Sequence, residues 1–337
     1  MSDIKEDLLE LILDTGALSR EQIAEFQSNQ EKFGNAFVIN MKNRPERLEE
    51  ATKTLSKVNI IFERFIAIDG KKCEKDKKWK NFCQRHFPKL RPEESGCLLS
   101  HLSILALAAT HPNKNNFTMI FEDDIVTSLT ASIDPTLRKI AHLDEEKSID
   151  LIYLGKCLET CTKMKHLDDN IYLAHSPSCA HAYAIKNSFA CRLLDDLDKI
   201  CNAPSQGSHP FNRGIDGIYK WYIEVENHHK KIRAVVVHPA IFFQDVLSGG
   251  SDLRKEFLKN YLECIDTDAH ANKKHHNNEK REEKHDKDRK DIQKKGAENK
   301  HHAGGIITLF VLIFMIAVFV AIIMLADKKN QKLLKGK

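Results

Sequence analysis

Short apolar runs rich in β-branched and aromatic residues alternate with amphipathic helical stretches through the middle of the chain, and this alternation constrains the fold most. It predicts an α/β domain with a mixed, mostly parallel sheet, because parallel strands need helical crossovers. In such sheets ligands bind beyond the carboxyl ends of the strands. The predicted strands cover residues 36–41, 62–68, 117–121, 151–154, 180–185 and 234–243, and the predicted helices cover residues 45–58, 97–110, 188–200 and 217–225.

The predicted domain spans residues 34–265, and a hydrophobic content of 42% in 337 residues is enough for a real core. The net charge of the chain is +4, of which +2 lies in residues 266–303 and +4 in residues 327–337. The rest of the chain therefore carries a net charge of −2. Because binding to a phosphate backbone needs a basic excess, we expect no nucleic-acid partner.

Residues 305–326 form an uncharged apolar run of 22 residues. A helix of that length spans about 33 Å, enough to cross a hydrocarbon core of ~30 Å. The run predicts one transmembrane helix over residues 304–326, which would place the chain in a lipid bilayer. A charged, flexible tether over residues 266–303 would precede it, and a basic tail over residues 327–337 would follow.

This order is that of a single-pass C-terminal anchor, in which the span leaves the ribosome last. We therefore expect the large N-terminal body to face the cytosol, on an internal membrane of a host cell or of a virus. The acidic N-terminus has no apolar run long enough for a signal peptide, which supports the same expectation.

Residues 1–33 predict a helical appendage of two short amphipathic helices. Ser19 and Gln22 have the spacing of a capping box at the start of the second helix. The segment is either a brace on the core or a docking site for a protein partner at residues 1–30, and we favour the brace.

The nine cysteines include no CxxC pair. Cys157, Cys161 and His166 have a spacing that a metal site could use, but we favour reduced thiols in an ordinary fold. That interpretation places the body of the chain in a reducing compartment.

Polar residues mark the junction between the predicted strand 36–41 and the following helix. Asn40, Arg44 and Arg47 surround Pro45, a residue suited to the first turn of a helix. Basic side chains beside the free N–H groups of a helix N-terminus favour a phosphate. A solvated surface turn would give the same pattern.

Three carboxylates, Glu122, Asp123 and Asp124, close the apolar strand over residues 117–121. Adjacent buried carboxylates are costly unless a cation compensates them, and oxygen ligands suit Mg²⁺ or Mn²⁺. An acidic strand exit without a metal is the alternative. Ser100 and His101 are expected on the first turn of the predicted helix 97–110, where they would point at a ligand, although a lone His is often structural.

The order and spacing of these motifs carry a family resemblance. The blocks FVINMKNRPER, FIAIDG, EESGCLLSHLSILALA and FEDDI, followed by DLIYLG, HAYA, IDGIY and PAIFFQDVLSGGSD, resemble the family 25 glycosyltransferases over residues 35–254. That family includes lipooligosaccharide galactosyltransferases and the collagen hydroxylysine galactosyltransferase domain. The resemblance implies a GT-A-like, Rossmann-like fold. It also implies transfer of a hexose, galactose or glucose, from a UDP-sugar donor to a hydroxyl of a glycan, lipid-linked or protein acceptor, with inversion and with Mn²⁺ or Mg²⁺.

The resemblance also implies roles for individual residues. Asp123 and Asp124 would hold the metal, and inversion needs a general base on the acceptor hydroxyl. Asp216 is our first candidate for this catalytic base and Asp245 the second. The residues implied in donor binding are Asn40, Arg44, Arg47, Ser100, His101, Glu122 and Asp123.

A second hypothesis is a catalytically degenerate transferase domain that acts as a membrane-anchored glycan-binding or structural protein. The intact carboxylate, Ser-His and Arg groups argue against it, because a protein without catalysis has little reason to keep such costly polar groups. The predicted anchor and tether also depart from the family pattern. We therefore expect an acceptor in the cytosol or at a membrane surface rather than secreted collagen.

Overall fold

The computed structural model describes residues 4–202, 214–224 and 232–245. The chain divides into two compact units, Met1–Asp266 and Thr267–Lys337, and the described residues belong to the first. The predicted tether 266–303, transmembrane helix 304–326 and tail 327–337 lie outside the described residues. Within the described ranges, none of the helices combines the length and the apolar character that a bilayer span requires.

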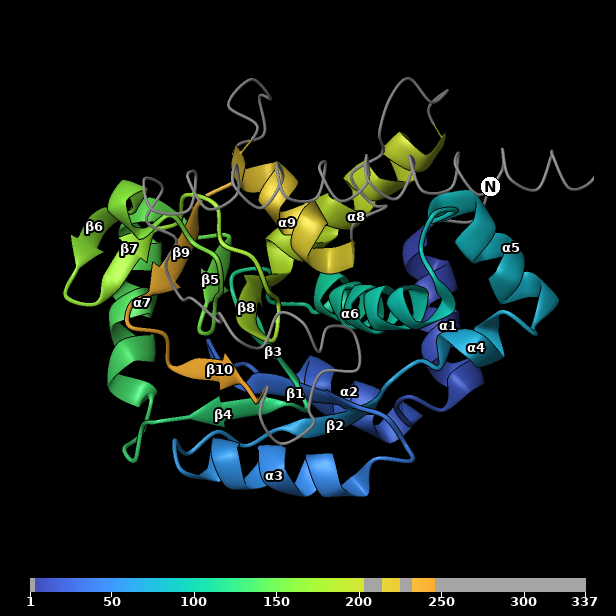
Figure 1. Cartoon of the computed structure of the whole chain (residues 1–337), viewed down its shortest axis with the longest axis horizontal. Coiled ribbons are helices and arrows are strands. Elements are labelled where there is room, and N and C mark those ends of the chain that lie inside the picture. Colours follow the sequence, from blue (N-terminus) through green and yellow to red (C-terminus); the bar gives the residue numbers. More distant parts are fainter. Residues whose placement is uncertain (1–3, 203–213, 225–231, 246–337) are drawn as a thin grey trace, which may run out of the picture. The chain divides into compact units, whose positions relative to one another are not determined.

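A mixed eight-stranded sheet forms the centre of the first unit, in the order β2-β1-β3-β8-β5-β9-β7-β6 (Figure 1). Of these eight described strands, six run in one direction and β7 and β8 run in the other. The predicted mixed, mostly parallel sheet is confirmed. The strands are β1 (Asn35–Asn40), β2 (Glu63–Ile66), β3 (Phe117–Glu122), β5 (Leu151–Tyr153), β6 (Lys165–Asp168), β7 (Ile171–Leu173), β8 (Ala182–Lys186) and β9 (Ala234–Val237).

Helices cover both faces of the sheet, which is why β1 is buried at every position. Phe37 and Ile39 belong to one hydrophobic cluster, whereas Ala36 and Val38 belong to a second cluster on the opposite face. The first cluster includes α1 (Ile4–Thr15), α6 (Pro92–Thr110), α8 (Asn187–Asn202) and α9 (Gly214–Glu224), and the second includes α3 (Pro45–Ser56) and α7 (Asp134–Lys147).

The N-terminal segment packs on the domain itself. Leu8, Leu11 and Ile12 of α1 are fully buried in the first hydrophobic cluster, which also contains the core of α6. The capping box at α2 (Arg20–Ser28) is confirmed, because Ser19 Oγ accepts the Gln22 N–H and Gln22 Oε1 accepts the Ser19 N–H. The apolar face of α1 is therefore used inside the fold, as a brace requires.

Several elements differ from the predicted ones. The predicted strand 234–243 is two strands, because Pro239 has no N–H for a continuous ladder. Its second part, β10 (Phe242–Gln244), pairs with β4 (Ile125–Thr127) in a separate antiparallel sheet. The elements that the sequence pattern did not predict are α4 (Gly70–Cys73), α5 (Lys77–His86), α7, β4, β6, β7 and the short 3₁₀ helix η1 (Cys161–Lys163).

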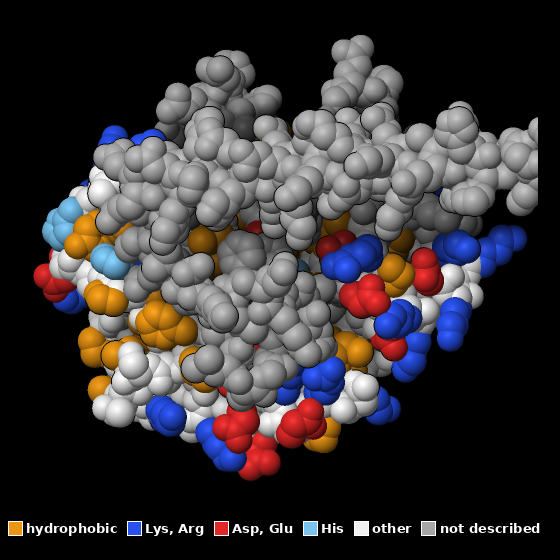
Figure 2. Space-filling model, in the orientation of Figure 1, with side chains coloured by type: hydrophobic (Ala, Val, Ile, Leu, Met, Phe, Trp, Pro, Cys, Tyr) orange, Lys and Arg blue, Asp and Glu red, His pale blue; other side chains and the backbone are white. Residues whose placement is uncertain are grey.

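Helix α6 begins five residues earlier than predicted. Pro92 occupies its first turn, and Glu94 Oε2 accepts the Arg91 N–H at 3.0 Å, so the start is capped. On the face shown in Figure 2, acidic and basic side chains are interspersed over α3, α4 and α5. This mixture agrees with the nearly neutral charge of the body.

The expectation of reduced thiols is wrong in part, because Cys157 and Cys179 form a disulfide and Cys161 is disulfide-bonded as well. His166, the third residue of the hypothetical metal site, is exposed on β6, and its Nε2 lies 3.1 Å from the Asp169 carbonyl oxygen. A site built on Cys157 and His166 is therefore not formed. The disulfide closes the segment that carries β6 and β7.

Removing this disulfide is expected to destabilise the fold. The bridged cysteines are 22 residues apart, and closing such a loop stabilises a protein by about 3 kcal/mol through the entropy of the unfolded chain. Cys157→Ser should lower the free energy of unfolding by about this amount in a urea titration under oxidising conditions. Cys191→Ser, which removes a free thiol, is the matched control. Equal losses in the two variants would contradict the assignment.

Candidate active site

The predicted polar residues gather at one edge of the sheet. Strands β1 and β3 are parallel, with Ile39 in register with Glu122, so both end at this edge. Strand β8 is antiparallel to β3 and starts there, and the Glu122 N–H donates to the carbonyl oxygen of His181 at 2.9 Å. The residues that follow β1 and β3 and precede β8 thus lie side by side, where an α/β sheet binds ligands.

Asp123 is held by the junction between β1 and α3. Asn40 Nδ2 donates to Asp123 Oδ2 at 2.6 Å, and Arg47 Nη1 lies 3.4 Å from Asp123 Oδ1. Asn40 Nδ2 also donates to the carbonyl oxygen of Arg44 at 2.9 Å, at the residue that precedes α3. On the other side, Arg64 Nη2 donates to Asn40 Oδ1 at 2.6 Å. The structure therefore brings the polar residues at the junction of β1 and α3 together with the carboxylate motif at the end of β3.

Glu122 points to the opposite side, toward α6. Its Oε1 lies 3.2 Å from His101 Nε2, and Gln244 Nε2 donates to its Oε2 at 3.4 Å. His101 is fully buried, and its Nδ1 lies 3.0 Å from the hydroxyl oxygen of Tyr183. Glu122 and Asp123 are adjacent on a strand end, so their side chains leave from opposite faces of the sheet.

The expectation that Ser100 and His101 lie on a first helical turn is wrong, because α6 starts at Pro92 and places them in its third turn. Ser100 Oγ accepts the Ile68 N–H at 2.9 Å and donates to the Gly96 carbonyl oxygen at 2.7 Å. The Ser100 hydroxyl is thus used inside the fold, where it ties α6 to the segment after β2. His101 does point at the carboxylates.

Asp124 carries the clearest sign of a ligand. Its Oδ2 lies 3.5 Å from Gln244 Nε2, whereas its Oδ1 is buried and has no hydrogen-bond partner among the described residues. The N–H of Asp245 donates to the Asp124 carbonyl oxygen at 2.6 Å, which places Asp245 beside the cluster. An unpartnered buried carboxylate oxygen is costly and fits a cation ligand.

The carboxylates influence one another strongly. Burial, together with the negative charge of Asp123, raises the pKa of Glu122 to about 7. Burial, with Glu122 and Asp123 beside it, raises the pKa of Asp124 to about 8. Without a cation the cluster therefore retains protons near neutral pH, and a divalent cation would replace them.

These shifts predict how stability depends on pH in metal-free protein. The folded-state pKa values of Glu122 and Asp124 exceed ordinary carboxyl values. The stability that their protonation contributes is therefore complete below the ordinary carboxyl pKa values and is lost as the pH rises through the folded-state values of about 7 and about 8. The melting temperature in EDTA should therefore fall as the pH rises from about 5 to about 8, and should level off above both folded-state values. Added Mn²⁺ should remove most of this fall, and Asp124→Asn should reduce it. A flat profile in EDTA would contradict the assignment.

Asp216 lies on the first turn of α9, and its charge acts on groups of the same site. Burial lowers the pKa of His101 to about 4, and the charge of Asp216 acts in the opposite direction. Asp216 also raises the pKa of Tyr153 and of Cys97, in both cases after burial as the main cause. Asp216 and Asp245, the two predicted bases, thus border the site from the His101 side and the Asp124 side.

Three contacting residues were not predicted. Tyr183 and Gln244 stand inside the motif blocks HAYA and PAIFFQD, so the blocks contained a signal for them. Arg64 lies in the short strand β2, outside the polar clusters that the sequence marks, and the pairing of β2 with β1 brings it to Asn40.

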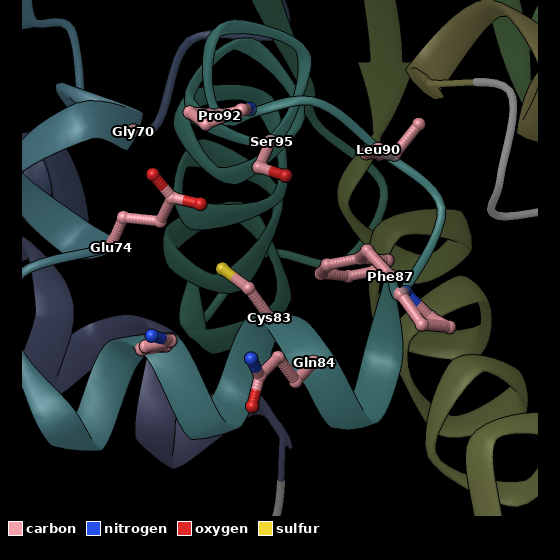
Figure 3. A pocket seen from close by; sticks show the side chains of 10 residues that line it. Gly70, Glu74, Cys83, Gln84, Phe87, Leu90, Pro92 and Ser95 are labelled. Carbon is pink, nitrogen blue, oxygen red and sulfur yellow. The ribbon is translucent and has the colours of Figure 1, made fainter. Parts of the chain in front are cut away.

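A cavity of about 160 Å³ lies elsewhere, between α4, α5 and the start of α6 (Figure 3). Ser95, Cys83 and Glu74 face it, together with the side chains of Phe87 and Leu90. None of the carboxylates at the sheet edge lines it.

Comparisons with known proteins show the family of the chain. The model of the family described as "Glycosyltransferase family 25 (LPS biosynthesis protein)" matches residues 33–205, more than half of the chain. A glycosyltransferase 25 family member of Drosophila melanogaster is 29% identical over 181 residues, which are 49% of this chain and 28% of that protein. One from Drosophila pseudoobscura pseudoobscura is 27% identical over 159 residues, 43% of this chain and 23% of that protein. The aligned regions thus span about a quarter of these relatives.

Two solved structures are also similar to the chain. The glycosyltransferase GlyE of Streptococcus pneumoniae TIGR4 has 11% sequence identity and a TM-score of 0.30, over 60% of this chain and 45% of that one. An active-site mutant of LgtC has 9% identity and a TM-score of 0.31, over 59% of this chain and 72% of that one. From the family match, which covers β1 to α8 and the carboxylate motif, the chain belongs to glycosyltransferase family 25.

Proposed function

We propose that this chain is a metal-dependent glycosyltransferase that moves a hexose from a UDP-sugar to an acceptor hydroxyl with inversion. The observation that carries the proposal is the carboxylate cluster at the carboxyl edge of the sheet, in which Asp124 Oδ1 is buried and has no hydrogen-bond partner in the part of the chain that the structure describes. A GT-A-like arrangement is part of the proposal. Galactose and glucose are the proposed sugars, by analogy with the family.

The residues present fit a hard divalent cation. Asp123 and Asp124 would hold Mn²⁺ or Mg²⁺, and when bound the ion would neutralise the charge that develops on the departing diphosphate. Arg47 contacts Asp123 and is only 20% exposed in its side chain, so it holds that carboxylate in orientation. Asn40 and Arg44 would bind the nucleotide end, with His101 and Glu122 on the sugar side.

The acceptor hydroxyl needs a base within about 3 Å. We propose Asp216, because it lies on the first turn of α9 and its charge acts on His101, on the sugar side of the site. Asp245 is the alternative, although its backbone contact with Asp124 favours a role at the diphosphate.

The proposed acceptor is a glycan, lipid-linked or protein hydroxyl near a bilayer. A flexible tether of about 38 residues would span roughly 35 Å, keep the active site close to the membrane and raise the effective concentration of acceptors there. The anchor over residues 304–326 and the cytosolic orientation are parts of this proposal.

The orientation has its own test. Disulfides persist mainly in oxidising compartments, whereas the cytosol is reducing. The Cys157–Cys179 disulfide and a cytosolic orientation of the body therefore lead to opposite expectations for the redox state of Cys157. Alkylation of the denatured chain, isolated from its native membrane without reductant, should label Cys157 if the body faces the cytosol. A blocked Cys157 would place the body on the oxidising side.

The function is tested by following UDP release from a panel of UDP-sugars by the full chain with Mn²⁺. Slow hydrolysis of one donor, lost in EDTA, is the expected result. A folded chain that neither hydrolyses nor binds any donor would instead support the second hypothesis, an anchored glycan-binding or structural protein.

A further inference from the structure

Three side chains of different chemistry meet beside the carboxylate motif. Cys97 and His101 of α6 and Glu122 at the end of β3 each offer one donor atom, and these atoms lie within 4.8 Å of one another. Cys97 and His101 are four residues apart, so they share one face of α6. Glu122 faces α6, whereas Asp123 faces α3.

We propose that Cys97, His101 and Glu122 form a binding site for Zn²⁺, distinct from the Mn²⁺ or Mg²⁺ position at Asp123 and Asp124. Sulfur, imidazole nitrogen and carboxylate oxygen are zinc ligands, and three protein ligands with one open position are common in zinc enzymes. Mn²⁺ and Mg²⁺ prefer oxygen ligands, so the two sites differ in the ion that they select.

The separations suit a tetrahedral ion. Zinc bonds of about 2.0–2.2 Å to nitrogen and oxygen put those two ligand atoms about 3.3 Å apart in a tetrahedron. His101 Nε2 and Glu122 Oε1 are 3.2 Å apart. A zinc-bound sulfur needs about 3.6 Å to each of them. The Cys97 sulfur therefore has to move by little more than an ångström.

Neighbouring groups hold two of the ligands in orientation. The Tyr183 hydroxyl lies 3.0 Å from His101 Nδ1, so Nδ1 can keep its proton while Nε2 binds the metal. Gln244 Nε2 donates to Glu122 Oε2, which leaves Oε1 for the ion. Partners of this kind orient the ligands and raise affinity in known metal sites.

Charge also favours zinc. Cys97 would lose its proton on binding, and one thiolate with one carboxylate balances the ion, so the occupied site is neutral in a buried place. Cys97 is half-buried. Zinc would take Glu122 from the donor site and inhibit transfer; this consequence, unlike the binding, rests on the proposed function.

Cobalt is the probe, because thiolate-bound Co²⁺ gives a charge-transfer absorption that histidines and carboxylates do not give. The full chain should bind one thiolate-ligated Co²⁺, which Zn²⁺ should displace. The control variant Cys191→Ser, which removes a half-buried free thiol on α8, should keep this absorption. Cys97→Ser should lose it and bind zinc at least tenfold more weakly. An absorption unchanged in Cys97→Ser, or absent from the wild-type chain, overturns the proposal.

A second measurement needs no variant. Zn²⁺ should slow alkylation of Cys97 in the folded wild-type chain at least tenfold, with Cys191 as the internal reference, read by mass spectrometry of the peptides. Equal slowing at the two cysteines, or none at Cys97, would overturn the site even if Cys97→Ser failed to fold.

Discussion

Asp124→Asn is expected to lower the rate of donor turnover by about 10³-fold or more, because loss of a metal-binding carboxylate removes several kcal/mol of transition-state stabilisation. The same change should leave the free energy of unfolding unchanged or higher in EDTA. Among the described residues Asp124 Oδ1 is buried without a hydrogen-bond partner, so the replacement removes a carboxyl group that is costly to bury. UDP release and urea unfolding measure the two effects.

Asp123→Asn is the matched comparison. Asp123 accepts hydrogen bonds from Asn40 and Arg47, so this variant should lose activity and also about 1–3 kcal/mol of stability. Opposite stability effects at adjacent carboxylates would separate a metal ligand from a residue that is also structural. If Asp124→Asn kept wild-type turnover, Asp124 would not be a ligand.

Asp216→Asn is expected to lower glycosyl transfer by about 10²–10⁴-fold, the usual contribution of a general base. Donor binding should stay within a factor of two or three, because Asp216 borders the site through α9 and not through the junction that holds Asp123. Rates with acceptor and affinities for UDP, measured on the same preparation, separate these effects.

Asp245→Asn should show the reverse pattern. Its N–H already contacts the Asp124 carbonyl oxygen, so its side chain is placed to affect metal and diphosphate affinity more than proton transfer. A transfer defect in Asp245→Asn with normal UDP affinity, together with an active Asp216→Asn, would move the base to Asp245.

The strands at the centre of the sheet were predictable because both of their faces are buried. Strands β1 and β3 are nearly continuous apolar runs in the sequence. Their observed bounds differ from the predicted ones by one residue at three of the four ends and agree at the fourth. Strands β6 and β7 were not predicted, because they are short and β6 has exposed polar residues. Helix α5 was missed for a similar reason: its sequence KKWKNFCQRH contains few apolar residues.

The site residues also fall into those that a local sequence pattern predicts and those that only the fold brings together. Glu122, Asp123 and Asp124 form a local motif, and the apolar strand before them indicates that they are costly without a cation. The contact of His101 with Tyr183, by contrast, joins α6 to β8 across 82 residues, and no local pattern predicts it. The disulfide between Cys157 and Cys179 likewise depends on the path of the chain through β6 and β7, which were not predicted.

The central claim is that Asp123 and Asp124 hold the cation through which a nucleotide diphosphate binds. Calorimetric titration of the full chain with UDP tests it most directly, with Mn²⁺ and then with EDTA, beside Asp124→Asn. We predict binding with Mn²⁺, and at least a tenfold loss of affinity both in EDTA and in the variant. Equal affinity for UDP in all three titrations would contradict the account.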